Sequence, residues 1–296
     1  MYEKFYGLRE KPFALNPDPS YLYQTERHRH ALTMLEYVLD QASGFALITG
    51  DVGCGKTTVV QHFLKRLNGR LNVAYITNTH LSFGSLLPWI VDALGLNVGQ
   101  PSPSELYRKF AQHAKAEFED GQRIIIVIDE AQNLGSSGLE ELRVLSNLNS
   151  GKDMLLQTIL VGQPELRGIL RLTALRQFAQ RIAIDHHLEP LSPEETAAYI
   201  RHRLDVAGGP VQLFSPTAVE LIHYTSGGVP RLVNIVCDTA LVYGFSDERP
   251  RIESDLVEQV IQDRAVGGLL PLRVREQTTL PDDRLSRGLA GAQVTP

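Results

Sequence analysis

Five short apolar runs divide the chain up to residue 190. Turn residues bound each run, and the segments between them have the three-to-four-residue period of amphipathic helices. Strands that alternate with helices are typical of a parallel sheet covered by helices. We therefore predict an α/β unit with strands at 45–50 (FALITG), 73–78 (VAYITN), 124–129 (IIIVID), 155–162 (LLQTILVG) and 182–188 (IAIDHHL).

The pattern changes at Ser192, after which only helical periodicity remains. The first helix of this region opens with a capping box of Ser192 and Glu195, with Pro193 at its first position. Beyond residue 265, glycine, proline and charged residues follow without a sustained period, which indicates a flexible tail. The predicted organisation is an N-terminal linker segment (1–30), an α/β core (31–190), a small helical domain (191–265) and the tail (266–296).

The composition is that of an ordinary globular protein, with 43% apolar and 21% charged residues among 296. The formal net charge of -5 gives no general attraction to nucleic acid, because phosphate binding needs clustered lysine and arginine. Cys54 and Cys237 are too few for a disulfide framework or a zinc site. No run approaches the ~18 apolar residues of a membrane span. These features predict a cytoplasmic protein, either free or docked peripherally at the inner membrane.

The most specific motif is GDVGCGKTT, which matches G-x-x-x-x-G-K-[ST] and lies between a predicted strand and a predicted helix. Glycines let backbone N–H groups turn inward around phosphate oxygens, and Lys56 can reach the β- and γ-phosphates. Thr57 is suited to ligate Mg²⁺. Cys54 is interpreted as a small residue of the loop. The alternative is a glycine-rich turn without a ligand. We predict that ATP binds at Gly50, Asp51, Val52, Gly53, Cys54, Gly55, Lys56, Thr57 and Thr58.

Two carboxylates, Asp129 and Glu130, follow the buried strand in RIIIVIDEAQNL. The carboxyl ends of parallel strands are where open α/β sheets bind ligands. Asp129 is suited to hold Mg²⁺, and Glu130 is suited to polarise an attacking water. A glutamate directly after this aspartate favours hydrolysis over phosphoryl transfer to a small molecule. The alternative is a solvated acidic turn. At the end of the next strand, the amide of Gln163 is suited to orient the water or to sense the γ-phosphate. The alternative is that Gln163 hydrogen-bonds a turn.

Taken in order, these motifs resemble those of AAA+ ATPases, and among them the ExeA/GspA family of type II secretion ATPases. The resemblance runs from Met1 to about Ala265, through FYGLREKPFALNPDPSYLY, GDVGCGKTT, IDEAQNL, ILVGQPELR, LRQFAQRI, LSPEETAAYIRHRL and SGGVPRLVN. It implies a P-loop AAA+ core of strand order 5-1-4-3-2 with a C-terminal helical lid. It also implies ATP-dependent assembly of the chain into a ring or filament, and work on envelope structures such as a secretin channel.

The resemblance assigns further residues. Gln163 corresponds to sensor 1, Arg231 to sensor 2, and Asn78 to a residue that restrains Glu130. Arg231 has separate support, because the apolar residues of VPRLVNIVCDTAL form one helical face and Arg231 lies on another. It can therefore face a nucleotide bound between the domains. A solvated surface arginine is the alternative.

Two arginines in LRQFAQR, Arg176 and Arg181, lie on different faces if the segment is helical, since successive residues turn by ~100°. A site built from the residues above lacks a cation for the outer γ-phosphate oxygens, and an arginine finger from a second subunit can supply it. The resemblance places such a residue before the last core strand. We predict Arg176 as this finger, with Arg181 as the second choice or a further interface contact, and surface charge as the alternative.

The chain departs from the family's secretion members, which continue into a membrane span and a periplasmic peptidoglycan-binding module. This departure predicts a stand-alone cytoplasmic ATPase, similar to those that accompany pilus or exopolysaccharide export. Other relatives of this shape resemble transposition ATPases of the TnsC/TniB kind, which bind DNA. The basic clusters at 26–31 and 62–70 are the local support for DNA, and the net charge gives none. A third interpretation is a nucleotide-gated switch that barely hydrolyses ATP.

Overall fold

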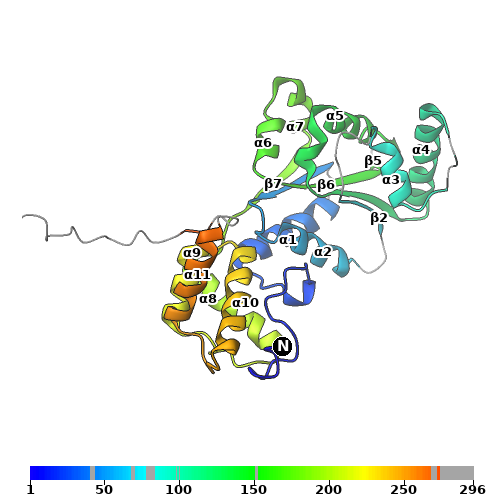
Figure 1. Ribbon diagram of the computed structural model, residues 1–296. Coiled ribbons are helices and arrows are strands. Elements are labelled where there is room, and N and C mark those ends of the chain that lie inside the picture. Colours follow the sequence, from blue (N-terminus) through cyan, green and yellow to red (C-terminus); the bar gives the residue numbers. More distant parts are fainter. Residues whose placement is uncertain are drawn as a thin grey trace, which may run out of the picture.

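The computed structural model in Figure 1 has an α/β core beside a smaller group of helices. The structure describes residues 1–40, 44–67, 71–77, 84–97, 99, 101–150, 153–267 and 272–273. Asn78 lies outside the described residues, and so does most of the predicted tail (268–271 and 274–296). What the sequence predicts for these positions stays a prediction.

Five parallel strands form one sheet in the order β2-β3-β6-β1-β7. Read from the other edge, this is the predicted order 5-1-4-3-2, so the predicted fold is confirmed. The second strand differs most from its predicted bounds: it begins at Leu71 and ends at Ile76, because it pairs with its neighbour from Arg123 to Ile128. The third strand is shifted by one residue from 124–129, and the fourth begins one residue later than predicted. The strands are β1 (Phe45–Gly50), β2 (Leu71–Ile76), β3 (Arg123–Ile128), β6 (Leu156–Gly162) and β7 (Ile182–Leu188).

The central strands are buried on both faces, and alternate residues point to opposite helical layers. In β3, Ile124, Ile126 and Ile128 pack into one apolar cluster, while Ile125 and Val127 pack into another. The second cluster contains the helices α1 (Glu26–Asp40) and α2 (Lys56–Arg66). The first contains α3 (Leu87–Ala93), α4 (Pro103–Glu119), α5 (Gly135–Leu145), α6 (Glu165–Leu170) and α7 (Arg176–Ala179).

Short elements connect these helices to the strands. A hairpin of two-residue strands precedes β6, and the sequence did not predict it because two residues show no alternation. The short strands are β4 (Asn149–Ser150) and β5 (Asp153–Met154), and the 3₁₀ turns are η1 (Pro19–Tyr21), η3 (Ala131–Leu134) and η4 (Thr173–Leu175).

In the part of the chain that the structure describes, four helices follow β7 and form what we call the lid. Their ends match local sequence signals: Ser192 and Glu195 form the predicted capping box, and Gly227 ends the second helix in the left-handed conformation, with φ 59°. The lid helices are α8 (Pro193–Val206), α9 (Pro216–Ser226), α10 (Pro230–Ser246) and α11 (Ser254–Gly267). Within the described ranges, no helix has both the length and the apolar character needed to cross a membrane.

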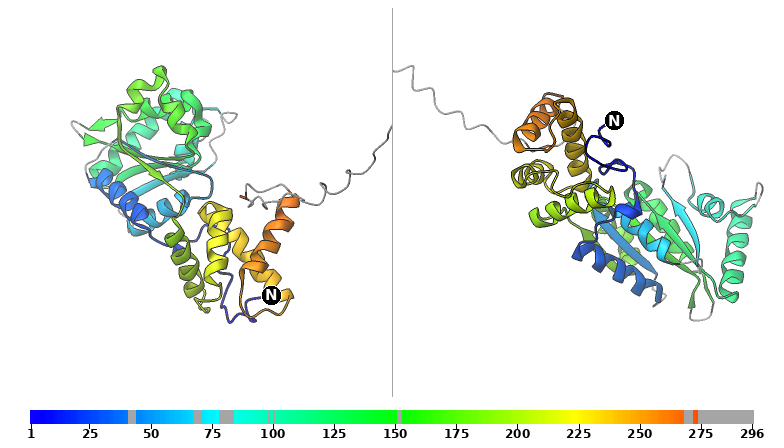
Figure 2. Two further views of the ribbon diagram at one scale, coloured as in Figure 1. Left: turned by 90° about the vertical axis from the view of Figure 1, so that its left-hand side faces the viewer. Right: turned by 90° about the horizontal axis from the view of Figure 1, so that it is seen from below.

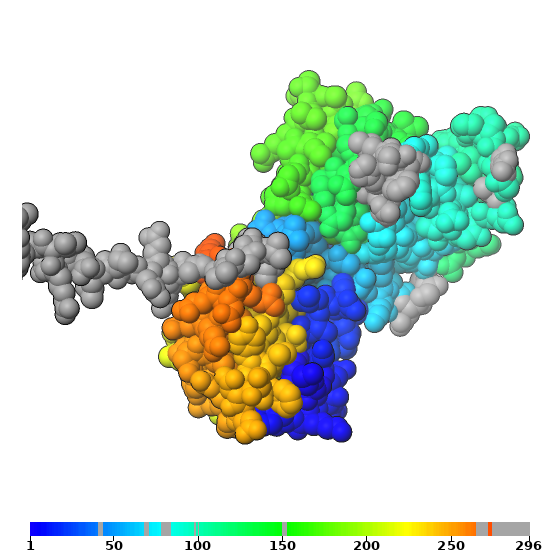
Figure 3. Space-filling view, viewed as in Figure 1, coloured from blue at the N-terminus to red at the C-terminus, as the bar shows by residue number. Residues whose placement is uncertain are grey.

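The N-terminal segment packs on the lid, although it precedes the core in the sequence. Tyr2, Tyr6, Leu8 and Phe13 are buried in the same apolar cluster as the lid helices. Figure 2 shows the segment running along the lid toward the sheet, and Figure 3 shows it beside the helices near the C-terminal end. The chain therefore begins in the lid, crosses to the core at α1, and returns to the lid after β7.

Candidate nucleotide-binding site

The loop between β1 and α2 has the conformation of a phosphate-binding loop. Gly53 and Gly55 both have φ 86°, which L side chains rarely adopt. Glycine is also needed for space: a Cβ at Gly50 would lie 2.5 Å from the carbonyl oxygen of Leu188, and one at Gly53 would lie 2.5 Å from the Cβ of Arg231. The loop is thus shaped both by its own backbone and by close neighbours in β7 and in the lid.

The ammonium group of Lys56 lies inside this loop. The side chain is buried, and its Nζ donates to the carbonyl oxygens of Gly50 at 2.8 Å and Asp51 at 2.9 Å. These two contacts hold the positive charge at the first turn of α2, where the N-terminal end of the helix adds further positive potential. This arrangement suits the binding of an anion such as a phosphate chain.

Thr57 and Asp129 meet at the carboxyl edge of the sheet. The Thr57 hydroxyl donates to Asp129 Oδ2 at 2.7 Å, and the backbone N–H of Glu130 donates to Asp129 Oδ1 at 2.9 Å. A hydroxyl and a carboxylate are oxygen donors of the kind Mg²⁺ uses when substrate phosphates and water complete its shell. The two residues predicted as metal ligands therefore lie together, with a donor set that fits the ion.

Tyr75, on β2, also contacts Asp129, and the sequence analysis missed it. Its hydroxyl donates to Asp129 Oδ2 at 3.1 Å. Burial and the neighbouring carboxylate raise the pKa of Tyr75 well above its usual value, so the hydroxyl stays protonated and remains a donor. Tyr75 comes close to Asp129 because β2 pairs with β3, where Tyr75 lies opposite Val127, two residues before Asp129. Knowledge of this strand pairing would have been needed to predict the contact.

Glu130 is held by two glutamine amides. Gln132 Nε2 donates to Glu130 Oε2 at 2.5 Å, and Gln163 Nε2 donates to the same oxygen at 3.1 Å. Glu130 has a left-handed backbone with φ 52°, which is uncommon for a residue other than glycine. The structure thus brings Gln163 to Glu130, as expected for residues at neighbouring strand ends, and adds Gln132, which the sequence analysis missed.

A cavity of about 210 Å³ lies between the core, the N-terminal segment and the lid. The phosphate loop and Glu130 form one wall, residues 14–18 and 21–23 form a second, and the lid forms the third. Arg231 lines this cavity, and its backbone N–H donates to the carbonyl oxygen of Gly53 at 3.2 Å. The lid residues in the wall are Leu191, Tyr199, Arg203, Pro230, Arg231 and Asn234.

Arg203 fastens the N-terminal segment to the lid beside this cavity. The side chain is buried, its Nε donates to the carbonyl oxygen of Pro12, and its guanidinium lies 4.6 Å from the ring centre of Tyr21. It also donates to the hydroxyl of Tyr199 at 2.8 Å, which in turn donates to Asn234 at 2.9 Å. Sequence patterns gave no sign of this role, because a helical arginine usually reads as a solvated charge.

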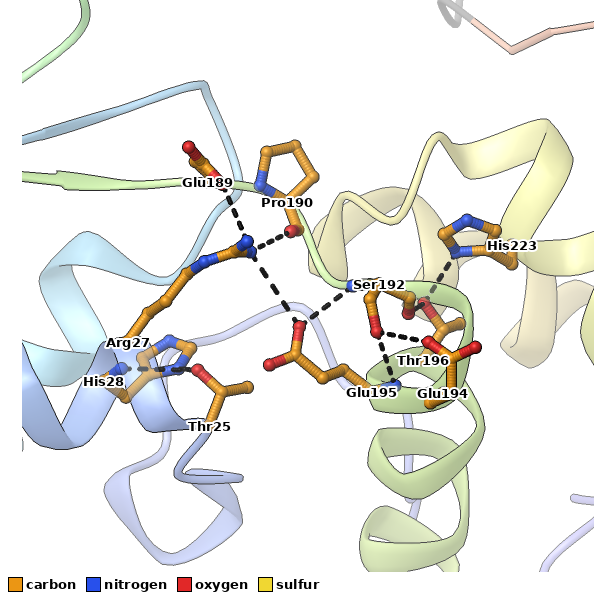
Figure 4. A network of polar contacts seen from close by, with 10 residues as sticks. All are labelled: Thr25, Arg27, His28, Glu189, Pro190, Ser192, Glu194, Glu195, Thr196 and His223. Carbon is orange, nitrogen blue, oxygen red and sulfur yellow. Dashed lines mark hydrogen bonds and ion pairs between the residues drawn. The ribbon is translucent and has the colours of Figure 1, made fainter.

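Figure 4 shows a second polar network, where β7 leads into the lid. Arg27 of α1 is 2.8 Å from Glu189 and 4.0 Å from Glu195, and it donates to the carbonyl oxygen of Pro190 at 3.2 Å. Its neighbour His28 faces the cavity instead and lies 2.6 Å from the hydroxyl of Thr25. Burial lowers the pKa of His28 to about 4, so the ring is neutral at physiological pH.

Arg176 and Arg181 lie away from this cavity in the same chain. Arg176 opens α7, is exposed, and its side chain makes no hydrogen bond or ion pair with any residue that the structure describes. Arg181 instead contacts its own subunit, donating to Ser146 Oγ at 2.7 Å and to the carbonyl oxygen of Arg143 at 3.4 Å. Of the two side chains, that of Arg176 is exposed and that of Arg181 is held by contacts within the chain.

Comparison with known proteins places the chain in a family. A family model described as "AAA domain" matches residues 39–170. General secretion pathway protein A of Aeromonas hydrophila is 44% identical over 247 residues, which make up 83% of this chain and 45% of that protein. The chain belongs to the general secretion pathway protein A family of AAA+ proteins. Its AAA+ fold implies nucleotide binding at the P-loop.

More distant relatives share part of the chain or only its fold. The ATP-dependent target DNA activator B of Escherichia phage Mu is 26% identical over 143 residues, 48% of this chain and 42% of that protein. The chain spans less than half the length of either curated relative. The ORC2 protein of Aeropyrum pernix, solved as ADPNP-ADP complexes, has a TM-score of 0.66 at 19% identity, with 86% of this chain and 71% of that chain covered.

Proposed function

We propose that the protein is an ATP hydrolase that acts as an oligomer. The observation that carries this proposal is the cluster at the sheet edge: Thr57 and Asp129 are joined by a 2.7 Å hydrogen bond, and Glu130 lines the same cavity as Lys56. The P-loop N–H groups and Lys56 bind the phosphates, while the lid and the N-terminal segment enclose the rest of the nucleotide. In this proposal the chain consists of a linker (1–30), a core (31–190), a lid (191–265) and a tail (266–296).

The residues at the strand ends divide the chemistry among them. Thr57 and Asp129 hold Mg²⁺, which when bound neutralises charge on the phosphate oxygens. Glu130 orients a water molecule toward the γ-phosphate and accepts its proton, and Gln163 contacts the γ-phosphate or the water. Arg231 reaches the nucleotide from the lid. Asn78 restrains Glu130 in the resting site.

A second subunit completes the site. The exposed side chain of Arg176 supplies positive charge to the γ-phosphate of its neighbour, with a contribution of about 10³–10⁵ in rate. Assembly into a ring or filament then becomes a requirement for turnover. The energy of the cycle is used to assemble or remodel partner proteins of an envelope export system, as the name of the Aeromonas relative suggests. We place the protein in the cytoplasm, with peripheral contact at the inner membrane.

Phosphate release by the purified chain tests the hydrolase. We expect the wild type to release phosphate from ATP with Mg²⁺, and Glu130→Gln to bind ATP normally but release phosphate about 10²-fold more slowly, since the general base is lost. Glu165→Gln is a matched control, because that carboxylate is exposed at the start of α6. Equal rates for the wild type and Glu130→Gln would contradict the proposal and favour a switch that barely hydrolyses.

The second candidate is a DNA-targeting ATPase, favoured by the similarity to the phage Mu protein. The basic residues of α1 and α2 are the local support, but ion pairs partly neutralise them, Arg27 with Glu189 at 2.8 Å and Arg66 with Glu36 at 3.3 Å. A gel shift with duplex DNA and ATP at low salt decides between the two. Binding that weakens steeply with salt would favour the DNA role. Its absence at low salt would remove that role.

A further inference from the structure

Gln132 uses both ends of its side-chain amide at the candidate active site. Its Nε2 donates to Glu130 Oε2 at 2.5 Å, and its Oε1 accepts from the backbone N–H of Gln163 at 3.0 Å. The first contact is to the candidate general base, and the second is to the end of β6. One side chain therefore joins the two positions on which the proposed hydrolysis depends.

The amide of Gln163 closes this arrangement into a ring. Its Nε2 reaches the same Glu130 oxygen at 3.1 Å, so two neutral amides donate to one carboxylate oxygen. Hydrogen bonds to a charged acceptor are about twice as strong as those between neutral groups, and two donors fix an orientation better than one. The direction of the Glu130 carboxylate is thus set jointly by η3 and by the end of β6.

The backbone around Gln132 is shaped to allow these contacts. Gly162 lies where a side chain would collide: a Cβ there would be 2.9 Å from Gln132 Oε1 and 2.8 Å from Leu166 Cδ2. At Glu130, the left-handed backbone (φ 52°) ends the line of β3 and begins the turn that carries Gln132. A left-handed backbone at a residue other than glycine costs on the order of 1 kcal/mol. Such strained conformations concentrate at functional sites.

We propose that Gln132 is a positioning residue that orients Glu130 and couples it to Gln163. A change at the end of β6, where Gln163 meets the γ-phosphate or water, is transmitted through the Gln132 amide to the base. This role rests on the proposed hydrolysis and adds to it the route by which the phosphate end of the nucleotide controls Glu130. Gln132 acts through Glu130 and Gln163, the two residues that its side-chain amide contacts.

Gln132→Met tests the role, because methionine keeps the length of the side chain and removes both hydrogen bonds. We expect kcat to fall about 10- to 100-fold while KM for ATP and the affinity for a fluorescent ATP analogue stay within about twofold. Asn133→Ala is the matched control, since that side chain is exposed at the next position of the same turn. A Gln132→Met enzyme with wild-type kcat, or an equal fall in Asn133→Ala, would overturn the role.

A second measurement separates positioning from a general loss of structure. If Gln132 acts through Glu130, adding Gln132→Met to Glu130→Gln lowers the single-turnover rate no further, whereas a structural defect lowers it again. Gly162→Ala is a further variant that displaces the Gln132 amide without altering it, and it should also lower kcat. If the wild type releases no phosphate, the hydrolase proposal itself is wrong. If the wild type is active and Gln132→Met has the same kcat, only the role of Gln132 is wrong.

Discussion

The backbone N–H of Arg231 donates to the carbonyl oxygen of Gly53, so the first turn of α10 is bonded directly to the phosphate loop. This contact crosses from the lid to the core at the cavity wall. The Cβ of Arg231 lies so close that any side chain at position 53 would overlap it. The position of the lid and the shape of the loop are therefore linked at one residue pair.

Gly53→Ala should damage nucleotide binding more than the loss of a flexible glycine alone would. The substitution adds backbone strain at φ 86° and a methyl group 2.5 Å from the Arg231 Cβ. We expect at least a tenfold loss of ATP affinity, measured with a fluorescent nucleotide. Gly95→Ala is the control, because Gly95 has φ 70° but nothing within 4 Å of its Cβ position. Equal ATP affinity in the two variants would show that the contact between Gly53 and Arg231 does not affect nucleotide binding.

Arg176→Ala should bind ATP as the wild type does and lose about 10³-fold in kcat, because the missing charge belongs to the neighbour's site. Mixing provides a direct measurement. Glu130→Gln and Arg176→Ala should each be slow alone, but a mixed oligomer contains sites with an intact Glu130 and an intact Arg176 from the next subunit. Phosphate release should therefore return on mixing. A mixture of Glu130→Gln with the double variant contains no such site and is the control.

Arg181→Ala should behave differently from Arg176→Ala, although both arginines lie in the same segment. Arg181 donates to Ser146 and to the carbonyl oxygen of Arg143 in its own subunit, so its loss should lower stability rather than the rate per folded site. We expect the free energy of unfolding to fall by about 1 kcal/mol, measured by urea denaturation. Mixing Arg181→Ala with Glu130→Gln should give no gain beyond the activity of Arg181→Ala alone. A gain on mixing would move the trans role from Arg176 to Arg181.

Arg203→Met should release the N-terminal segment from the lid. The guanidinium holds the carbonyl oxygen of Pro12 and lies over the ring of Tyr21, and methionine keeps the bulk without these contacts. We expect faster proteolytic cleavage between residues 12 and 18 and a KM for ATP raised about tenfold, since one cavity wall loosens. Arg201→Ala, exposed on the same helix, serves as the control. Unchanged cleavage would show that other contacts hold the segment.

His28 makes stability depend on pH. Because burial lowers its pKa to about 4, the unfolded chain binds a proton here between about pH 6.5 and 4 while the folded chain does not. The folded state therefore loses stability as the pH falls through this window. Relative to His28→Gln, the wild type should lose roughly 2 kcal/mol more between pH 7.5 and 5, as measured by urea unfolding. His30→Gln, exposed on the same helix, should follow the wild type.

The sequence was sufficient for the parts of the site that are local in the chain. A P-loop is a contiguous strand, loop and helix, so its glycines, Lys56 and Thr57 follow from spacing. Asp129 and Glu130 follow from the apolar strand before them, and the strand order follows from the resemblance to AAA+ proteins. Gln163 lies beside Glu130 because two neighbouring parallel strands end at the same edge of the sheet.

The residues that the sequence missed depend on contacts between distant elements. Tyr75 reaches Asp129 only because β2 pairs with β3, and Gln132 reaches Gln163 only because position 162 has no side chain. Arg203 meets Pro12 across 191 positions of sequence. Such pairs produce no periodic pattern or motif in the sequence. Within its own segment each residue looks ordinary, because tyrosine is common in strands, glutamine in turns and arginine in helices.

The path of the N-terminal segment gives the lid two covalent connections to the core. The first runs through residues 14–25 from the lid into α1, and the second through Glu189–Ser192 out of β7. Arg27 ties the two together, because it follows the first connection in α1 and contacts Glu189 and Pro190 in the second. A substitution that removes the Arg27 side chain should therefore loosen both connections at once.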